Sequence, residues 1–175
     1  MHLLLYTFPE VDGAAGMTRD IVVVGLGNGY RKDDGVGVVA ADAIKEAALP
    51  QVRVVTNISD PARLLDAWQD AGLAVVIDAA EGNPSTLGHV RRWLIGDLAQ
   101  VSEELSSHNI DIGATHALAQ ALGKAPAATV VFTVDVLETG HGVGLSGQVA
   151  DAVPEVVRLV LAEIDRARAP TTRFL

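Results

Sequence analysis

The sequence of 175 residues contains no cysteine, which excludes disulfides, thiolate metal sites, iron–sulfur clusters and a cysteine nucleophile. Aromatic residues are scarce, at 4%, so alanine, valine, leucine and glycine dominate the candidate core. Basic residues are outnumbered, because 13 Lys and Arg stand against 22 Asp and Glu, giving a formal net charge of -9. This acidic balance argues against nucleic acid or an anionic membrane as the main partner.

Long apolar runs are also missing, since none reaches the roughly 18 residues of a membrane helix. Residues 1–19 hold a short apolar stretch with no Lys or Arg before it, which makes a poor signal peptide. We therefore expect a cytoplasmic protein with a loosely ordered extension over 1–19, starting at either Met1 or Met17. Residues 20–167 are expected to form a single α/β domain and 168–175 a frayed tail.

Apolar patterning predicts the secondary structure, because buried strands read as continuous apolar runs and amphipathic helices as apolar positions at helical spacing. The strands are expected at 21–26, 52–55, 73–79, 87–94 and 128–136. The helices are expected at 34–47, 61–71, 110–122 and 147–166. Asp60-Pro61 is a helix start, Ser146 resembles the cap of the last helix, and Pro154 should kink that helix.

This order of elements indicates one three-layer α/β domain with a five-stranded, mostly parallel sheet and helices on both faces. Only residues 80–86 join the third and fourth strands, which is too short for a parallel crossover. The fourth strand should therefore run antiparallel. The helix over 110–122 then begins at the carboxyl edge of the parallel strands, where ligands of open α/β sheets bind.

The glycine-rich segment after the first strand does not fit a dinucleotide-binding loop. Tyr30 occupies the position of the third glycine, and Asp33 and Asp34 would repel a pyrophosphate. A P-loop, a Ser nucleophile elbow and an HExxH zinc motif are also absent from the sequence.

Two acids and one histidine converge on the carboxyl edge in the predicted topology. Asp34 follows the first strand, Asp78 belongs to the third, and His108 precedes the helix over 110–122. Such an oxygen, oxygen and nitrogen set suits a divalent metal with open positions. Simple helix-capping and turn roles are the alternative for each residue. The competing histidines are His2, His89, His116 and His141.

The segment GLGNGYRKDDGVG resembles the opening motif of the hydrogenase maturation endopeptidases, which trim the large subunit of nickel–iron hydrogenases. The motif VVIDA around Asp78, the Ser-His-Asn segment at His108 and the Gly-Leu-Ser sequence ending at Ser146 extend the resemblance over about residues 20–165. The loops after the second and fifth strands depart from the family pattern, which leaves the choice of substrate open.

The resemblance implies an endopeptidase that removes the C-terminal peptide from a nickel-loaded hydrogenase large-subunit precursor. It assigns the catalytic and metal-contacting positions to Asp34, Asp78 and His108. The nickel would come with the substrate, and zinc or cadmium could occupy the same site. Backbone groups of Gly27 and Asn28 could contact the precursor, with simple turn chemistry as the alternative.

Asp33, beside Asp34 in the motif, is expected to join Gly27 and Asn28 in binding the substrate. We expect a monomer whose partner is the hydrogenase precursor. Two other classes stay open: a non-catalytic module that binds a metal or a metalloprotein, and a nucleotide-binding α/β regulator.

Overall fold

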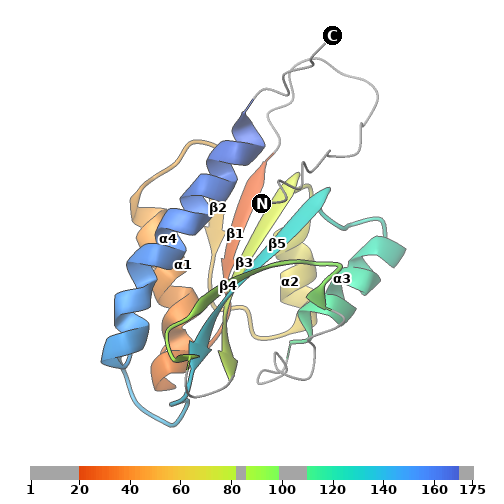
Figure 1. The fold of residues 1–175 in the computed structure, drawn as a ribbon. Helices are drawn as coiled ribbons and strands as arrows, with labels where there is room; N and C mark the ends of the chain where they lie inside the picture. Colours follow the sequence, from red (N-terminus) through yellow and green to blue (C-terminus); the bar gives the residue numbers. More distant parts are fainter. Residues whose placement is uncertain (1–19, 82–85, 99–109, 170–175) are drawn as a thin grey trace.

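A parallel sheet with one antiparallel edge strand forms the centre of the protein (Figure 1). The computed structural model describes residues 20–81, 86–98 and 110–169. Within these ranges the strands are β1 (Ile21–Gly25), β2 (Val52–Val55), β3 (Leu73–Glu81), β4 (Val90–Leu94) and β5 (Ala128–Val136). The helices are the 3-10 turn η1 (Lys32–Gly35), α1 (Val36–Glu46), α2 (Pro61–Trp68), α3 (Ile112–Ala121) and α4 (Gly147–Arg168).

The strand order is β2-β1-β3-β5-β4, and only β4 runs antiparallel to its neighbour. The antiparallel fourth strand is confirmed, and β1 lies directly beside β3. The parallel strands end at the lower edge of the molecule in Figure 1, where the chain turns into α1 and α4. This lower edge is the carboxyl edge on which the candidate residues were expected.

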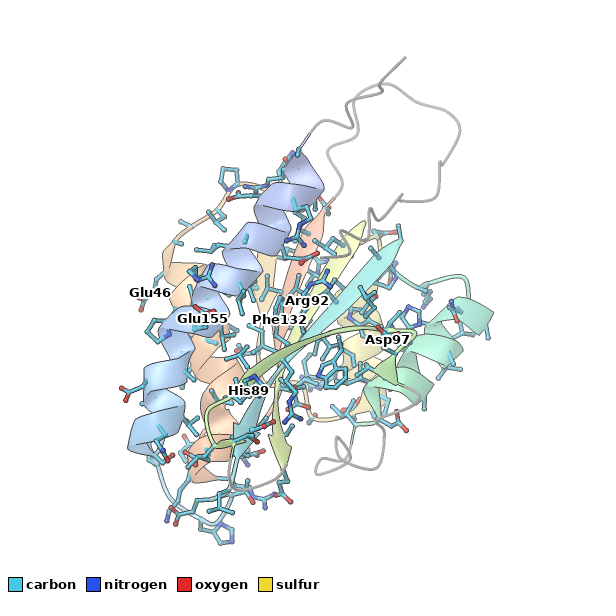
Figure 2. All side chains as sticks on the ribbon, in the orientation of Figure 1. Glu46, His89, Arg92, Asp97, Phe132 and Glu155 are labelled. Carbon is cyan, nitrogen blue, oxygen red and sulfur yellow. The ribbon has the colours of Figure 1, made fainter. Side chains whose placement is uncertain are left out.

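Helices cover both faces of the sheet, which confirms the predicted three-layer α/β domain (Figure 1). On one face, α1 and α4 pack against side chains such as Val75 and Phe132. Phe132 is labelled beside α4 in Figure 2. On the other face, α2 and α3 pack against Val76 and Val131. Burying each such side chain stabilises the fold by roughly 1.5–3 kcal/mol. None of the helices in the described ranges is long and apolar enough to cross a membrane.

Ionic contacts join the long helix α4 to the edge strand β4. The Arg92 guanidinium donates Nε–H to Glu163 Oε2 at 2.9 Å and an Nη2 hydrogen to Oε1 at 3.0 Å. Arg166 also donates to Glu163, which is only 7% exposed. Glu155, labelled in Figure 2, lies nearer the start of α4 as an exposed side chain paired with Arg158. The buried Glu163 therefore joins helix α4 to the edge strand β4.

Element ends differ from the sequence expectations where local backbone geometry intervenes. Helix α2 begins as predicted, with Asp60 accepting a hydrogen bond from Arg63 N. It stops at Trp68 because the next residue, Gln69, leaves the helical region with a ψ of 131°. Strand β4 begins later than expected, since His89 N donates to Thr86 O in a turn.

The last helix differs at both of its ends. Ser146 occupies the N-cap position of α4, but its side chain makes no capping hydrogen bond. The helix runs through Pro154 and continues to Arg168, beyond the expected end at 166. Of the predicted tail over 168–175, residues 170–175 lie outside the described ranges.

Two glycines allow the first helical turn to approach the sheet without space for a side chain. A Cβ on Gly37 would lie 2.4 Å from both Ile77 O and Leu26 O. A Cβ on Gly25 would lie 2.5 Å from Gly37 O and 2.7 Å from the Cβ of Ala41. This close approach places the start of α1 directly against β3, one residue before Asp78.

Replacing Gly37 by alanine should lower the free energy of unfolding by about 1–3 kcal/mol or more, because the methyl group meets fixed backbone on two sides. The matched control is Gly147→Ala at the start of α4, where an added Cβ meets nothing within 4 Å. Urea denaturation measures both variants. Equal stabilities would contradict this packing account.

A buried histidine on the second face should make stability depend on pH. His116 of α3 is 8% exposed and contacts Trp68 edge-on, with ring centroids 5.9 Å apart. Burial lowers the pKa of His116 from its ordinary value of 6.5, because the charged imidazolium loses hydration. As pH falls through 6.5, the unfolded chain therefore gains a proton that the folded protein does not bind.

The free energy of unfolding should fall between pH 7.5 and 5.5, with a contribution from His116 of at most about 1.4 kcal/mol per pH unit. Denaturation of the wild type and of His116→Gln at both pH values measures this contribution. The variant should show a shallower dependence, whereas His141→Gln, at an exposed position, should match the wild type. An unchanged dependence in His116→Gln would contradict the assignment.

Candidate active site

Asp34 lies in η1, and its carboxylate faces the turn that follows β1. The residue is only 2% exposed, and Asn28 N donates to its Oδ2 at 3.0 Å. The alternative role as a helix cap does not apply, because Gly35 occupies the N-cap position of α1 and no side chain caps it. The carboxylate is therefore held by the backbone of the opening motif.

Gly27 makes this turn possible. Its φ is 108°, and an added Cβ would lie 1.9 Å from Asp34 O, so any other residue would displace Asp34. Asn28 uses its side chain within the same turn, since Tyr30 N donates to Asn28 Oδ1 at 2.9 Å. Gly27 and Asn28 thus fix the position of Asp34.

Asp78 lies in β3, three residues before the strand ends at Glu81. It is 2% exposed, and Ala79 N donates to its Oδ1 at 2.8 Å. Strand β1 stops at the register of Ile77, and Leu26 N donates to Ile77 O at 2.9 Å. Beyond that point η1 packs against β3, so the structure brings Asp34 and Asp78 to the same edge of the sheet.

The histidine of the predicted triad, His108, lies outside the described residues, as does His2. Among the others, His89 and His141 are exposed, and His116 is buried against Trp68. Within the described ranges, no cluster of three His, Asp or Glu side chains could hold a metal ion. The described part of the candidate site therefore consists of the two carboxylates.

Asp33 joins the opening motif to the last helix. Its carboxylate is 1% exposed, and it accepts hydrogen bonds from Ser146 N at 2.6 Å and from Ser146 Oγ at 2.9 Å. Both oxygens are therefore directed toward the start of α4. This contact also explains why the Ser146 hydroxyl does not cap its own helix.

The sequence analysis missed a polar group beside Asp78. Thr133 of β5 is the register partner of both Asp78 and Arg91, so the three side chains point to one face of the sheet. Trp93 Nε1 donates to Thr133 Oγ1 at 2.9 Å. Arg91 Nη2 donates to Oδ2 of Asp135, a carboxylate that is 1% exposed, at 2.8 Å.

The sequence signal for this group was the pair of polar residues Thr133 and Asp135, at alternate positions near the end of a mostly apolar strand. The Arg91 side chain is partly exposed, whereas the Asp135 carboxylate is buried. Their ion pair joins β4 to β5, two residues after the position in β5 that pairs with Asp78.

Buried carboxylates at the edge of a sheet have two general chemical uses. Carboxylate oxygens are common ligands of divalent metals, and a carboxylate can also accept a proton from an attacking water.

Structural comparison finds the same fold in known hydrogenase-processing enzymes. The endopeptidase HybD from Escherichia coli superimposes with a TM-score of 0.75 at 18% identity, over 85% of this chain and 93% of that chain. The nickel–iron hydrogenase maturation protease HybD from Thermococcus kodakarensis gives 0.64 at 23% identity, over 82% and 97%. At these identities the similarity shows the fold alone.

Sequence comparison establishes the family. Among proteins with curated functional descriptions, none matches this chain. The family profile described as hydrogenase maturation protease (HycI) matches residues 38–163, which is most of the chain. This range contains Asp78 and His108, whereas Asp34 lies just before it. The chain therefore belongs to the hydrogenase maturation protease family, whose members are peptidases.

Proposed function

We propose that the protein removes the C-terminal peptide from the nickel-loaded precursor of a nickel–iron hydrogenase large subunit. The observation that carries this proposal is the pair of buried carboxylates, Asp34 and Asp78, at the carboxyl edge of the sheet in a member of this protease family. The reaction would take place in the cytoplasm, with the protein acting as a monomer on this precursor.

Nickel bound in the precursor would be recognised by Asp34, Asp78 and His108. The carboxylates supply hard oxygen ligands, and a neutral imidazole would supply nitrogen. Because these bonds form only when the precursor carries its metal, a loaded precursor would bind more tightly than an empty one. Zinc or cadmium added to the free protein would occupy the same position.

Peptide hydrolysis adds the hydroxide of a water molecule to the scissile carbonyl carbon and transfers a proton to the leaving amine. A carboxylate of the pair would accept the proton of the attacking water and return it to the amine. Asn28 N–H holds Oδ2 of Asp34, which fixes that carboxylate for either metal binding or proton transfer.

The turn of the opening motif would also bind the substrate. Gly27 is partly exposed and Asn28 is exposed beside Asp34, so an extended peptide bound at the site would pass next to both residues. Asp33 would contribute through its bonds to Ser146, which hold the loop before α4 next to this turn.

Replacing Asp78 by asparagine keeps the side-chain shape but removes the negative charge, and processing should slow by at least about 10²-fold. The measurement is the intact mass of the hydrogenase large subunit, from a strain that lacks this protein and carries either the wild type or the variant. The subunit should keep its C-terminal extension in the deletion strain and with Asp78→Asn.

The matched control is Asp42→Asn, which makes the same change at an exposed aspartate of α1 and should restore the mature mass. A mature subunit in the deletion strain would contradict the proposed function. Wild-type behaviour of Asp78→Asn would contradict the proposed site, and binding of the precursor without cleavage would indicate a non-catalytic module.

The purified full-length protein should bind Cd²⁺ or Ni²⁺, and Asp78→Asn should weaken that binding by at least about tenfold because one ligand loses its charge. Isothermal titration of wild type, Asp78→Asn and the exposed control Asp42→Asn measures the three affinities. Only the Asp78 variant should differ. Equal affinity in all three proteins would place the metal elsewhere.

A further inference from the structure

Two loops at the carboxyl edge are tied together through their backbones. Lys32 N donates to Gly142 O at 3.0 Å, Gly142 N donates to Tyr30 O at 3.0 Å, and Asp33 N donates to Glu138 O at 3.0 Å. The turn after β1 and the loop between β5 and α4 therefore form one continuous surface. In Figure 1 this loop runs along the lower edge of the molecule.

Side chains reinforce the connection between these loops. Lys32 forms an ion pair with Glu138, and Arg31 Nε donates to Thr139 O at 3.1 Å. Thr139 Oγ1 donates in turn to Glu81 Oε1 at 2.8 Å, which fixes the loop to the end of β3. These contacts hold the two loops and the end of β3 together.

This surface carries exposed apolar side chains. Tyr30 is 77% exposed, Val143 is 81% exposed and Leu137 is 60% exposed. The two highest values among the large hydrophobic residues of the described ranges belong to Tyr30 and Val143, which flank the same backbone hydrogen bond. Clustered exposed hydrophobic residues mark interaction sites, and tyrosine is enriched in protein interfaces.

The apolar surface is continuous with the candidate active site. Tyr30 N donates to the side chain of Asn28, and Asn28 N donates to the Asp34 carboxylate. Tyr30 is therefore two hydrogen bonds away from the Asp34 carboxylate, so a protein whose peptide reaches Asp34 would have Tyr30 beside it. The charge of -9 disfavours self-association through the same surface.

We propose that Tyr30, Leu137 and Val143 form a docking surface for the body of the substrate protein. This surface would take an apolar patch next to the peptide that is cleaved, so that binding energy comes from outside the metal and the scissile bond. The inference rests on the proposed function, and it adds to that function a second point of recognition, independent of nickel.

The test compares two double variants of the full-length protein acting on the nickel-loaded precursor. Tyr30→Ser/Val143→Ser removes two side chains of the apolar surface. The control, Leu118→Ser/Leu122→Ser, removes two exposed apolar side chains elsewhere: Leu118 in α3 is 47% exposed, and Leu122 at the end of α3 is 54% exposed. The first variant should raise KM about tenfold and leave kcat within about twofold, because it weakens binding but not the chemical step. The second should match the wild type.

Thermal unfolding shows whether both variants fold as the wild type does, and Val143→Asp provides a single substitution at the most exposed position. An unchanged KM in Tyr30→Ser/Val143→Ser and in Val143→Asp would overturn the docking proposal alone. A wild-type dimer that these substitutions dissociate would assign the surface to a second copy instead. Failure of the wild-type protein to process the precursor would overturn the proposed function and this inference together.

Discussion

The close approach of the first turn of α1 to strand β3 is the constraint on which the site depends. Gly37 fits between Ile77 O and Leu26 O, with no room for a side chain. Because of this contact, Asp34 at the start of the helix and Asp78 in the strand share one edge of the sheet. A helix held farther from β3 would move Asp34 away from Asp78.

The same turn also connects the carboxylates to the surface around them. Gly27 and Asn28 fix Asp34, while Asp33 reaches across to Ser146 at the start of α4. The loop before α4 is thereby placed beside the opening motif. The two adjacent acids thus have different partners: Asp33 accepts hydrogen bonds from Ser146, and Asp34 accepts one from Asn28 N.

Most of the architecture could be predicted from the sequence, because apolar runs indicate where the strands lie and a short connection indicates the direction of the fourth strand. The boundaries of β2 and β5 and the antiparallel β4 needed only those signals. Asp78 could be located because an acid in a buried strand is conspicuous. The bonds of Asp33 to Ser146 and of Arg91 to Asp135 could not be predicted. Each joins residues that are distant in the chain, and residues of these types are also common on protein surfaces.

The central claim is that Asp34 and Asp78 form one site that binds a metal. The most direct test is the anomalous diffraction of crystals of the full-length protein soaked with Cd²⁺. The account predicts a peak within about 2.0–2.6 Å of a carboxylate oxygen from both Asp34 and Asp78. A peak at an exposed histidine such as His89 or His141, with none between the two aspartates, would contradict it.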